Sequence, residues 1–109
     1  MRGALSLSLG EVTEEWPLIR YLMDDPVYQA KYVDYVEALI NGVFTPETLT
    51  AHLKELHEML RPYVVGPDGE LDGYTHLQSD EAFDTGLTQL IQHVNKRYQV
   101  ASEYIEHMK

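Results

Sequence analysis

The stretch EEWPLIRYLMDDPVYQAKYVDYVEALI, residues 14–40, decides the fold class because it holds two helix starts and a periodic apolar stripe. Trp16-Pro17 and Asp25-Pro26 each place a proline where the first turn of a helix tolerates it, and Asp25 is a favoured N-cap. The apolar residues after Pro26 recur every three or four positions, as on one helix face. They are Tyr28, Tyr32, Tyr35, Val36, Leu39, Ile40 and, just beyond the stretch, Val43. We therefore predict two consecutive helices whose tyrosines pack mostly in the core.

Two further helices are predicted downstream. Thr45-Pro46 repeats the start signal, and Pro62 predicts an end or a kink near Arg61 because proline lacks a backbone donor. The apolar stripe between them is Leu49, Leu53, Leu56, Met59, Leu60 and Tyr63. After a glycine-rich loop at 64–76, Ser79 is the expected N-cap of a long last helix. Its stripe is Phe83, Leu87, Leu90, Ile91, Val94, Tyr98, Ala101, Ile105 and Met108.

These patterns predict an all-α fold, a small bundle of three long helices and one short N-terminal helix. The expected ranges are about 16–23, 25–43, 46–61 and 79–108. Residues 14–109 are expected to form a single helical domain. Residues 1–13 contain ALSLSL (4–9), whose alternation is a weak strand signal without a partner strand in the chain. We expect this part to be either a disordered leader or the remnant of a strand.

Composition excludes several functions. The chain has 109 residues and a formal net charge of −10, so its surface is unsuited to nucleic acid or to an anionic membrane. No segment has the length of a transmembrane span or of a signal peptide, and we expect a soluble protein. The absence of cysteine excludes disulfides, thiol nucleophiles and thiolate zinc sites, and it leaves the compartment open.

The loop DGELDG is the sharpest local motif. Asp68, Glu70 and Asp72 occupy positions 1, 3 and 5 of an EF-hand-like loop, and Gly73 occupies position 6. The bidentate glutamate expected at position 12 is replaced by Ser79. The favoured interpretation is a solvated acidic turn, and a calcium site formed by the three acids is the alternative.

Other candidate chemistry is also weak in the sequence. His52 and His57 are five residues apart on one helix and cannot chelate a metal from one face. The glycines form no phosphate-binding loop. The group Tyr28, Tyr32 and Tyr35 could stack on a sugar or a nucleobase, although core packing is favoured. We predict that this chain alone is not an enzyme and has no catalytic, cofactor-binding or metal-binding residue.

The order of these pieces resembles the C-terminal helical part of the CotH (spore coat protein H) family of atypical kinases. The resemblance covers residues 16–108 through WPLIRYLMDDPVYQAKYVDYVEALINGVFTPETLTAHLKELHEMLRPYV, then GYTH, then VNKRYQVASEYI. The matching residues are Pro17, Leu18, Ile19, Leu22, Pro26, Tyr28, Tyr32, Phe44, Pro46, Glu47, Leu49, Leu56, Leu60, Pro62, Tyr74, Thr75, Phe83, Ile91 and Arg97. One departure is His76, where the family has a serine.

The resemblance implies a specific role. The nucleotide-binding lysine and the metal-binding aspartates of the family precede this region, so no catalytic residue carries over. It therefore implies a non-catalytic C-terminal helical module that packs against an upstream catalytic core, with ATP and a divalent metal bound only in that core. The residues 1–13 would then be the tail of the core's last strand or its connecting loop. The family implies a bacterial protein of the spore coat or another extracytoplasmic site.

Two alternatives remain open at this point. The chain could be a stand-alone helical interaction module that forms a homo-oligomer through an unused apolar face. A small calcium-binding regulator would depend on the loop 68–73 alone. The expected partners are thus the catalytic domain of the same polypeptide or a second copy of the chain. Met1 need not be the natural start, so a longer reading frame is expected under the first interpretation.

Overall fold

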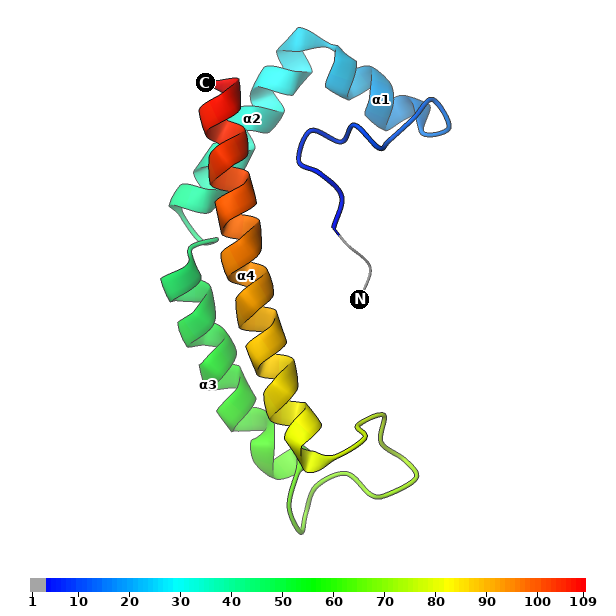
Figure 1. Ribbon diagram of the computed structural model, residues 1–109, viewed down its shortest axis with the longest axis vertical. Helices are drawn as coiled ribbons and strands as arrows, with labels where there is room; N and C mark the ends of the chain where they lie inside the picture. The colour runs from blue at the N-terminus through cyan, green and yellow to red at the C-terminus, as the bar shows by residue number, and fades with distance from the viewer. Residues whose placement is uncertain (1–3) are drawn as a thin grey trace. The chain divides into compact units, whose positions relative to one another are not determined.

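The computed structural model describes residues 4–109, and its regular elements are all helices (Figure 1). There are four of them: α1 (Pro17–Asp24), α2 (Pro26–Asn41), α3 (Pro46–Val64) and α4 (Asp80–Met108). No strand occurs in residues 4–109. The all-α prediction is confirmed, and the observed helix bounds lie within three residues of the predicted ones.

The helices begin where their capping residues predict. The Asp25 carboxylate accepts hydrogen bonds from the backbone N–H groups of Val27 (2.9 Å) and Tyr28 (3.4 Å) at the start of α2. The Thr45 hydroxyl accepts one from the N–H of Thr48 at 3.4 Å, which caps α3. Ser79 directly precedes α4, and its hydroxyl accepts one from the N–H of Ala82 at 3.3 Å. Each cap satisfies N–H groups that have no partner within the helix.

The α3 helix continues past its predicted end. Pro62 lies inside it, and the helix ends only at Val64, three residues beyond Arg61. Proline removes one donor but leaves its own carbonyl and the following residues able to continue the helix. The N–H of Val65 donates to the carbonyl of Arg61 at 2.9 Å and closes the last turn.

The chain divides into two compact units, and the predicted single domain spans both. Unit 1 comprises residues 1–43 and 98–109, of which 4–43 and 98–109 are described, and unit 2 comprises residues 44–97. The long helix α4 contributes its first part to unit 2 and its last residues to unit 1.

Unit 1 has a small core that uses only part of the predicted tyrosine stripe. Its buried side chains are Val12, Met23, Val33, Ile40 and Ala101. Tyr28 and Tyr35 are 53% and 75% exposed, so the prediction that they pack in the core is wrong. The buried face of α2 is rotated relative to the predicted one, because its buried residues are Val33 and Ile40. In the same unit, the Lys109 ammonium pairs with the carboxylates of Asp34 (2.8 Å) and Glu37.

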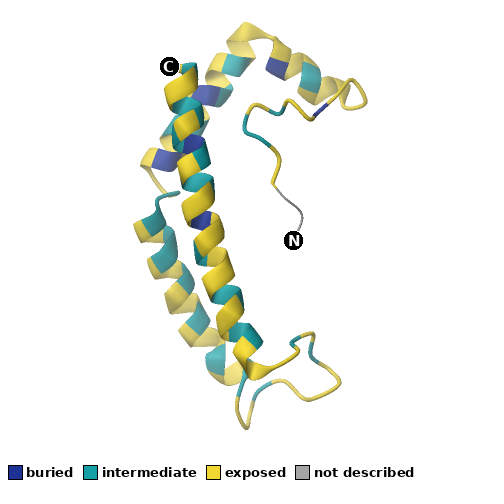
Figure 2. Ribbon diagram, viewed as in Figure 1, coloured by how far each residue is buried: buried dark blue, intermediate teal, exposed yellow. Residues whose placement is uncertain are grey.

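Unit 2 pairs α3 with the first part of α4, antiparallel and side by side (Figure 1). Val94 is its only buried apolar side chain among the described residues. Figure 2 shows that α3 carries no buried residue. The core is therefore thin, and much of the apolar surface that the sequence supplies is left exposed.

The segment 4–13 forms turns and not a strand. It contacts the helices of unit 1 through its backbone: the Tyr32 hydroxyl donates to the Leu7 carbonyl at 2.6 Å. The Arg20 guanidinium donates to the carbonyls of Leu9 and Val12, both at 2.9 Å. The segment is thus attached to α1 and α2, and its origin as a leader or as a strand remnant stays a prediction. The first three residues of the predicted leader lie outside the described residues.

The loop between α3 and α4 is shaped by glycines. Gly66 and Gly73 have positive φ values of 98° and 86°, which other residues rarely adopt. The N–H of Glu70 returns to the carbonyl of Val64 at 3.1 Å. A Cβ atom at Gly69 would lie 2.6 Å from the Val64 carbonyl oxygen, so this turn excludes any side chain. Across residues 4–109, no helix is both long enough and apolar enough to cross a membrane.

Candidate functional site

An apolar groove lies in unit 1. It has a volume of about 340 Å³, at the lower end of the range typical of ligand pockets. The segment 4–13 contributes one residue, α1 three and α2 four. The lining residues are Leu9, Ile19, Leu22, Met23, Tyr28, Lys31, Tyr32 and Tyr35.

The groove is shaped by the junction of α1 and α2. Asp25 ends α1 and caps α2, so the two helices follow each other without a loop. Arg20 reaches from α1 to the carbonyls of the segment 4–13 and also pairs with the Asp24 carboxylate at 3.0 Å. These bonds hold Leu9 in place as one wall, although its φ of 55° is unusual for a residue other than glycine.

The chemistry of the groove suits an apolar partner. Lys31 is the only charged side chain that lines it. A sugar or nucleotide needs several convergent hydrogen-bonding groups, and the aliphatic and aromatic lining does not supply them. The tyrosine group that could stack on such a ligand therefore lines a surface better suited to side chains of another protein.

Apolar exposure extends from the groove along α1. Trp16, Leu18 and Tyr21 are 63%, 74% and 72% exposed, and Ile19 and Leu22 in the groove are about 40% exposed. Met23 is the only buried residue of this helix. An eight-residue helix with this much exposed apolar surface is typical of an interaction site.

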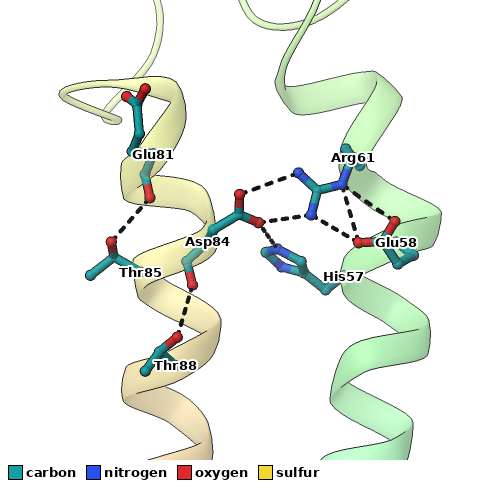
Figure 3. Close-up of polar contacts among 7 residues, drawn as sticks. All are labelled: His57, Glu58, Arg61, Glu81, Asp84, Thr85 and Thr88. Atoms are coloured by element: carbon teal, nitrogen blue, oxygen red, sulfur yellow. Dashed lines mark hydrogen bonds and ion pairs between the residues drawn. The ribbon is translucent and has the colours of Figure 1, made fainter.

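A polar cluster lies in unit 2 between α3 and α4 (Figure 3). The Asp84 carboxylate accepts hydrogen bonds from Arg61 at 2.7 Å and lies 2.9 Å from Nε2 of His57. Arg61 also pairs with Glu58 at 2.8 Å. The ring of His57 stacks on Phe83 with centroids 3.8 Å apart and planes 14° apart. The cluster joins the two helices by charge and stacking where the core is thin.

The sequence alone does not predict this cluster. In the sequence, His57 is a candidate metal ligand and Arg61 marks an expected helix end. The partners Phe83 and Asp84 are more than twenty residues away, and no local pattern connects them. The one available signal was that His57 and Arg61 are four residues apart, hence on one helix face.

The Arg61 guanidinium and the hydrogen bond with His57 lower the pKa of Asp84 from 3.8 to about 2. The Asp84 carboxylate thus binds a proton less readily in the folded chain than in the unfolded chain. The cluster stabilises the fold fully above about pH 4, and the contribution is lost as the pH falls through the folded pKa.

We expect Asp84→Asn to lower the melting temperature at pH 7 by a few degrees, a modest effect because the carboxylate is 58% exposed. Thermal melts monitored by circular dichroism would measure it. Asp72→Asn, in the exposed loop, is the matched control and should change little. The difference between the Asp84→Asn chain and the wild type should shrink as the pH falls from 4 toward 2, and a difference of unchanged size at pH 2 would contradict the assignment.

The three acids of the loop 68–73, the alternative calcium site, are not brought together. Asp68, Glu70 and Asp72 are all exposed. Residues 4–109 contain no group of three or more His, Asp or Glu side chains placed to hold a metal ion. The backbone bond from Glu70 to Val64 ties the loop to the end of α3 instead of wrapping it around an ion.

Comparisons with known proteins place the chain in a family. The family model described as "CotH kinase protein" matches residues 3–101. Searches of curated proteins and of solved structures found no match. The matched region includes α1, α2, α3 and most of α4, and thus both the groove and the polar cluster. The resemblance inferred from the sequence is confirmed, and the chain belongs to the CotH kinase protein family.

Proposed function

We propose that the chain is the non-catalytic C-terminal helical module of a CotH-like protein kinase and packs against the catalytic core of that kinase. The observation that carries the proposal is the groove of unit 1, with exposed apolar side chains along its rim. Small monomeric proteins rarely expose apolar patches of this kind without a binding partner. The core would bind ATP and a divalent metal, and this chain would supply a supporting surface.

Leu22 is the best probe of the proposed contact. It lines the groove and is 41% exposed, so a partner can bury it further. A carboxylate at this position would have to be desolvated without a counter-charge when the core binds. Val43 is 69% exposed and lies outside the groove lining, so Val43→Asp introduces the same charge as a control.

The test measures binding of the chain to a purified catalytic domain of the CotH family from the same genome, by titration calorimetry. We expect saturable binding of 1:1 stoichiometry, weakened at least tenfold by Leu22→Asp and unchanged by Val43→Asp. Absence of binding by the wild-type chain would overturn the proposed function. Equal loss with both variants would place the contact elsewhere.

A stand-alone helical interaction module is the second candidate. A different surface favours it, an apolar stripe on α3 in unit 2.

A further inference from the structure

The α3 helix presents an apolar stripe to solvent. Leu56, Met59, Leu60 and Tyr63 are 36%, 59%, 47% and 73% exposed. Their spacing of three, one and three residues places them on one face about 100° wide. The sequence predicted this stripe as the core face of the helix, and that prediction is wrong for these four residues.

A different face of α3 contacts α4. Leu53, His57, Arg61 and Val64 are half-buried and recur every three or four residues. His57 and Arg61 are held there by Asp84 and Phe83 of α4. This pairing turns the apolar stripe away from α4 by roughly a quarter to a third of a turn. Within unit 2, the stripe is therefore left without a partner helix.

The stripe itself is uncharged, which suits contact with a second copy of this acidic chain. No charged residue interrupts the stripe, and Glu55 is its nearest formal charge along the helix face. The other charged residues of α3 lie on its opposite side: Glu47, Lys54, Glu58 and Arg61. Two copies of an acidic chain repel least where they meet through uncharged side chains.

The stripe is also self-complementary. Its spacing of three, one and three reads the same in both directions. If two α3 helices pack antiparallel around a two-fold axis between Met59 and Leu60, Leu56 faces the partner subunit's Tyr63. Met59 then faces the partner subunit's Leu60. A two-fold interface requires this property, because each contact must occur twice.

We propose that the α3 stripe is a homodimer contact, formed by two antiparallel α3 helices. Four partly exposed side chains per copy bury an area in the low class of interfaces, below about 1,200 Å². The dimer is therefore reversible and weak, in the micromolar range or above. Each copy carries a charge of −10, so added salt strengthens the association by screening the repulsion.

Sedimentation equilibrium of the full chain tests the proposal, with concentration and salt varied. We expect a monomer–dimer equilibrium that shifts toward dimer between low and high salt. Met59→Glu should weaken it at least tenfold, while Leu22→Asp in the groove of unit 1 leaves it unchanged. A chain that stays monomeric at millimolar concentration, or association insensitive to Met59→Glu, would overturn the proposal. Melting curves check that both variants remain folded.

The direction of the helices has its own test, because the chain has no cysteine of its own. Met59→Cys places two thiols next to the two-fold axis, and oxidation should give a disulfide-linked dimer. His52→Cys, on the same face of α3, places them roughly 22 Å apart along an antiparallel pair and should give none. Cross-linking at both positions would indicate parallel helices and would contradict the proposed geometry.

The two proposals fail in different ways. Loss of binding to the catalytic domain with Leu22→Asp concerns the groove, and loss of self-association with Met59→Glu concerns the stripe. If Met59→Glu abolished binding to the catalytic domain and left self-association unchanged, the stripe would be part of the core contact. That result would refute the homodimer and leave the proposed function standing.

Discussion

Replacing Val94 with aspartate is expected to abolish cooperative folding of unit 2. Val94 is only 7% exposed and is the buried apolar side chain of this unit within the described residues. A carboxylate there would lose its water and gain no cation, at a cost of several kcal/mol. A domain of this size has roughly 5–15 kcal/mol of stability in total, and a thin core places it at the low end.

Leu90→Asp provides the matched comparison on the same helix. Leu90 is one turn earlier in α4 and 50% exposed, so a carboxylate at that position keeps most of its water. We expect the Leu90→Asp chain to melt cooperatively within a few degrees of wild type. Circular dichroism melts of the two variants would decide the matter. Equal damage from both substitutions would show that exposure on α4 is assigned incorrectly.

Ile40→Ala is expected to cost about 2–4 kcal/mol of unfolding free energy, the second largest effect. Ile40 is 5% exposed in unit 1, whereas Leu39, its neighbour on α2, is 47% exposed. The two side chains have the same number of carbon atoms, so the comparison isolates burial. Leu39→Ala should cost less than about half as much, because part of its surface is already in water.

Urea denaturation at pH 7 measures both variants of this pair. A linear dependence on urea with an unchanged slope would show that the difference lies in stability and not in the denatured state. If Leu39→Ala proved the more damaging substitution, the exposures of these two side chains on α2 would be assigned incorrectly.

The sequence predicted the helices well because helix starts are local. Asp25, Thr45 and Ser79 each satisfy N–H groups two or three residues later, so the signal and its effect lie within one turn. The end of α3 was less predictable, because Pro62 removes one hydrogen bond and the neighbouring turn can absorb that loss.

The faces of the helices were harder to predict than their positions. On α3, an apolar stripe and a polar face with His57 and Arg61 compete for the contact with α4. Phe83 and Asp84 decide in favour of the polar face by stacking and charge, and they lie on another helix. On α2, Tyr28 and Tyr35 satisfy helical periodicity as well as Val33 does, so periodicity alone cannot fix which of them is buried.

Both proposed surfaces contain residues whose side of the helix periodicity predicts incorrectly. Tyr28 and Tyr35 were assigned to the core, and they line the groove of unit 1. Met59 and Tyr63 were assigned to the core as well, and they form the exposed stripe of unit 2. An apolar residue that periodicity assigns to the core but the fold leaves exposed is a reasonable candidate for an interface.

The excluded side chain at Gly69 has a practical meaning for protein engineering. The first half of the loop after α3 is tied down, because Gly69 abuts the Val64 carbonyl and Glu70 bonds to it. The second half contains Leu71 and Tyr74, which are 69% and 87% exposed. An epitope tag or fluorescent label therefore belongs after Gly73. There it would leave the end of α3 intact.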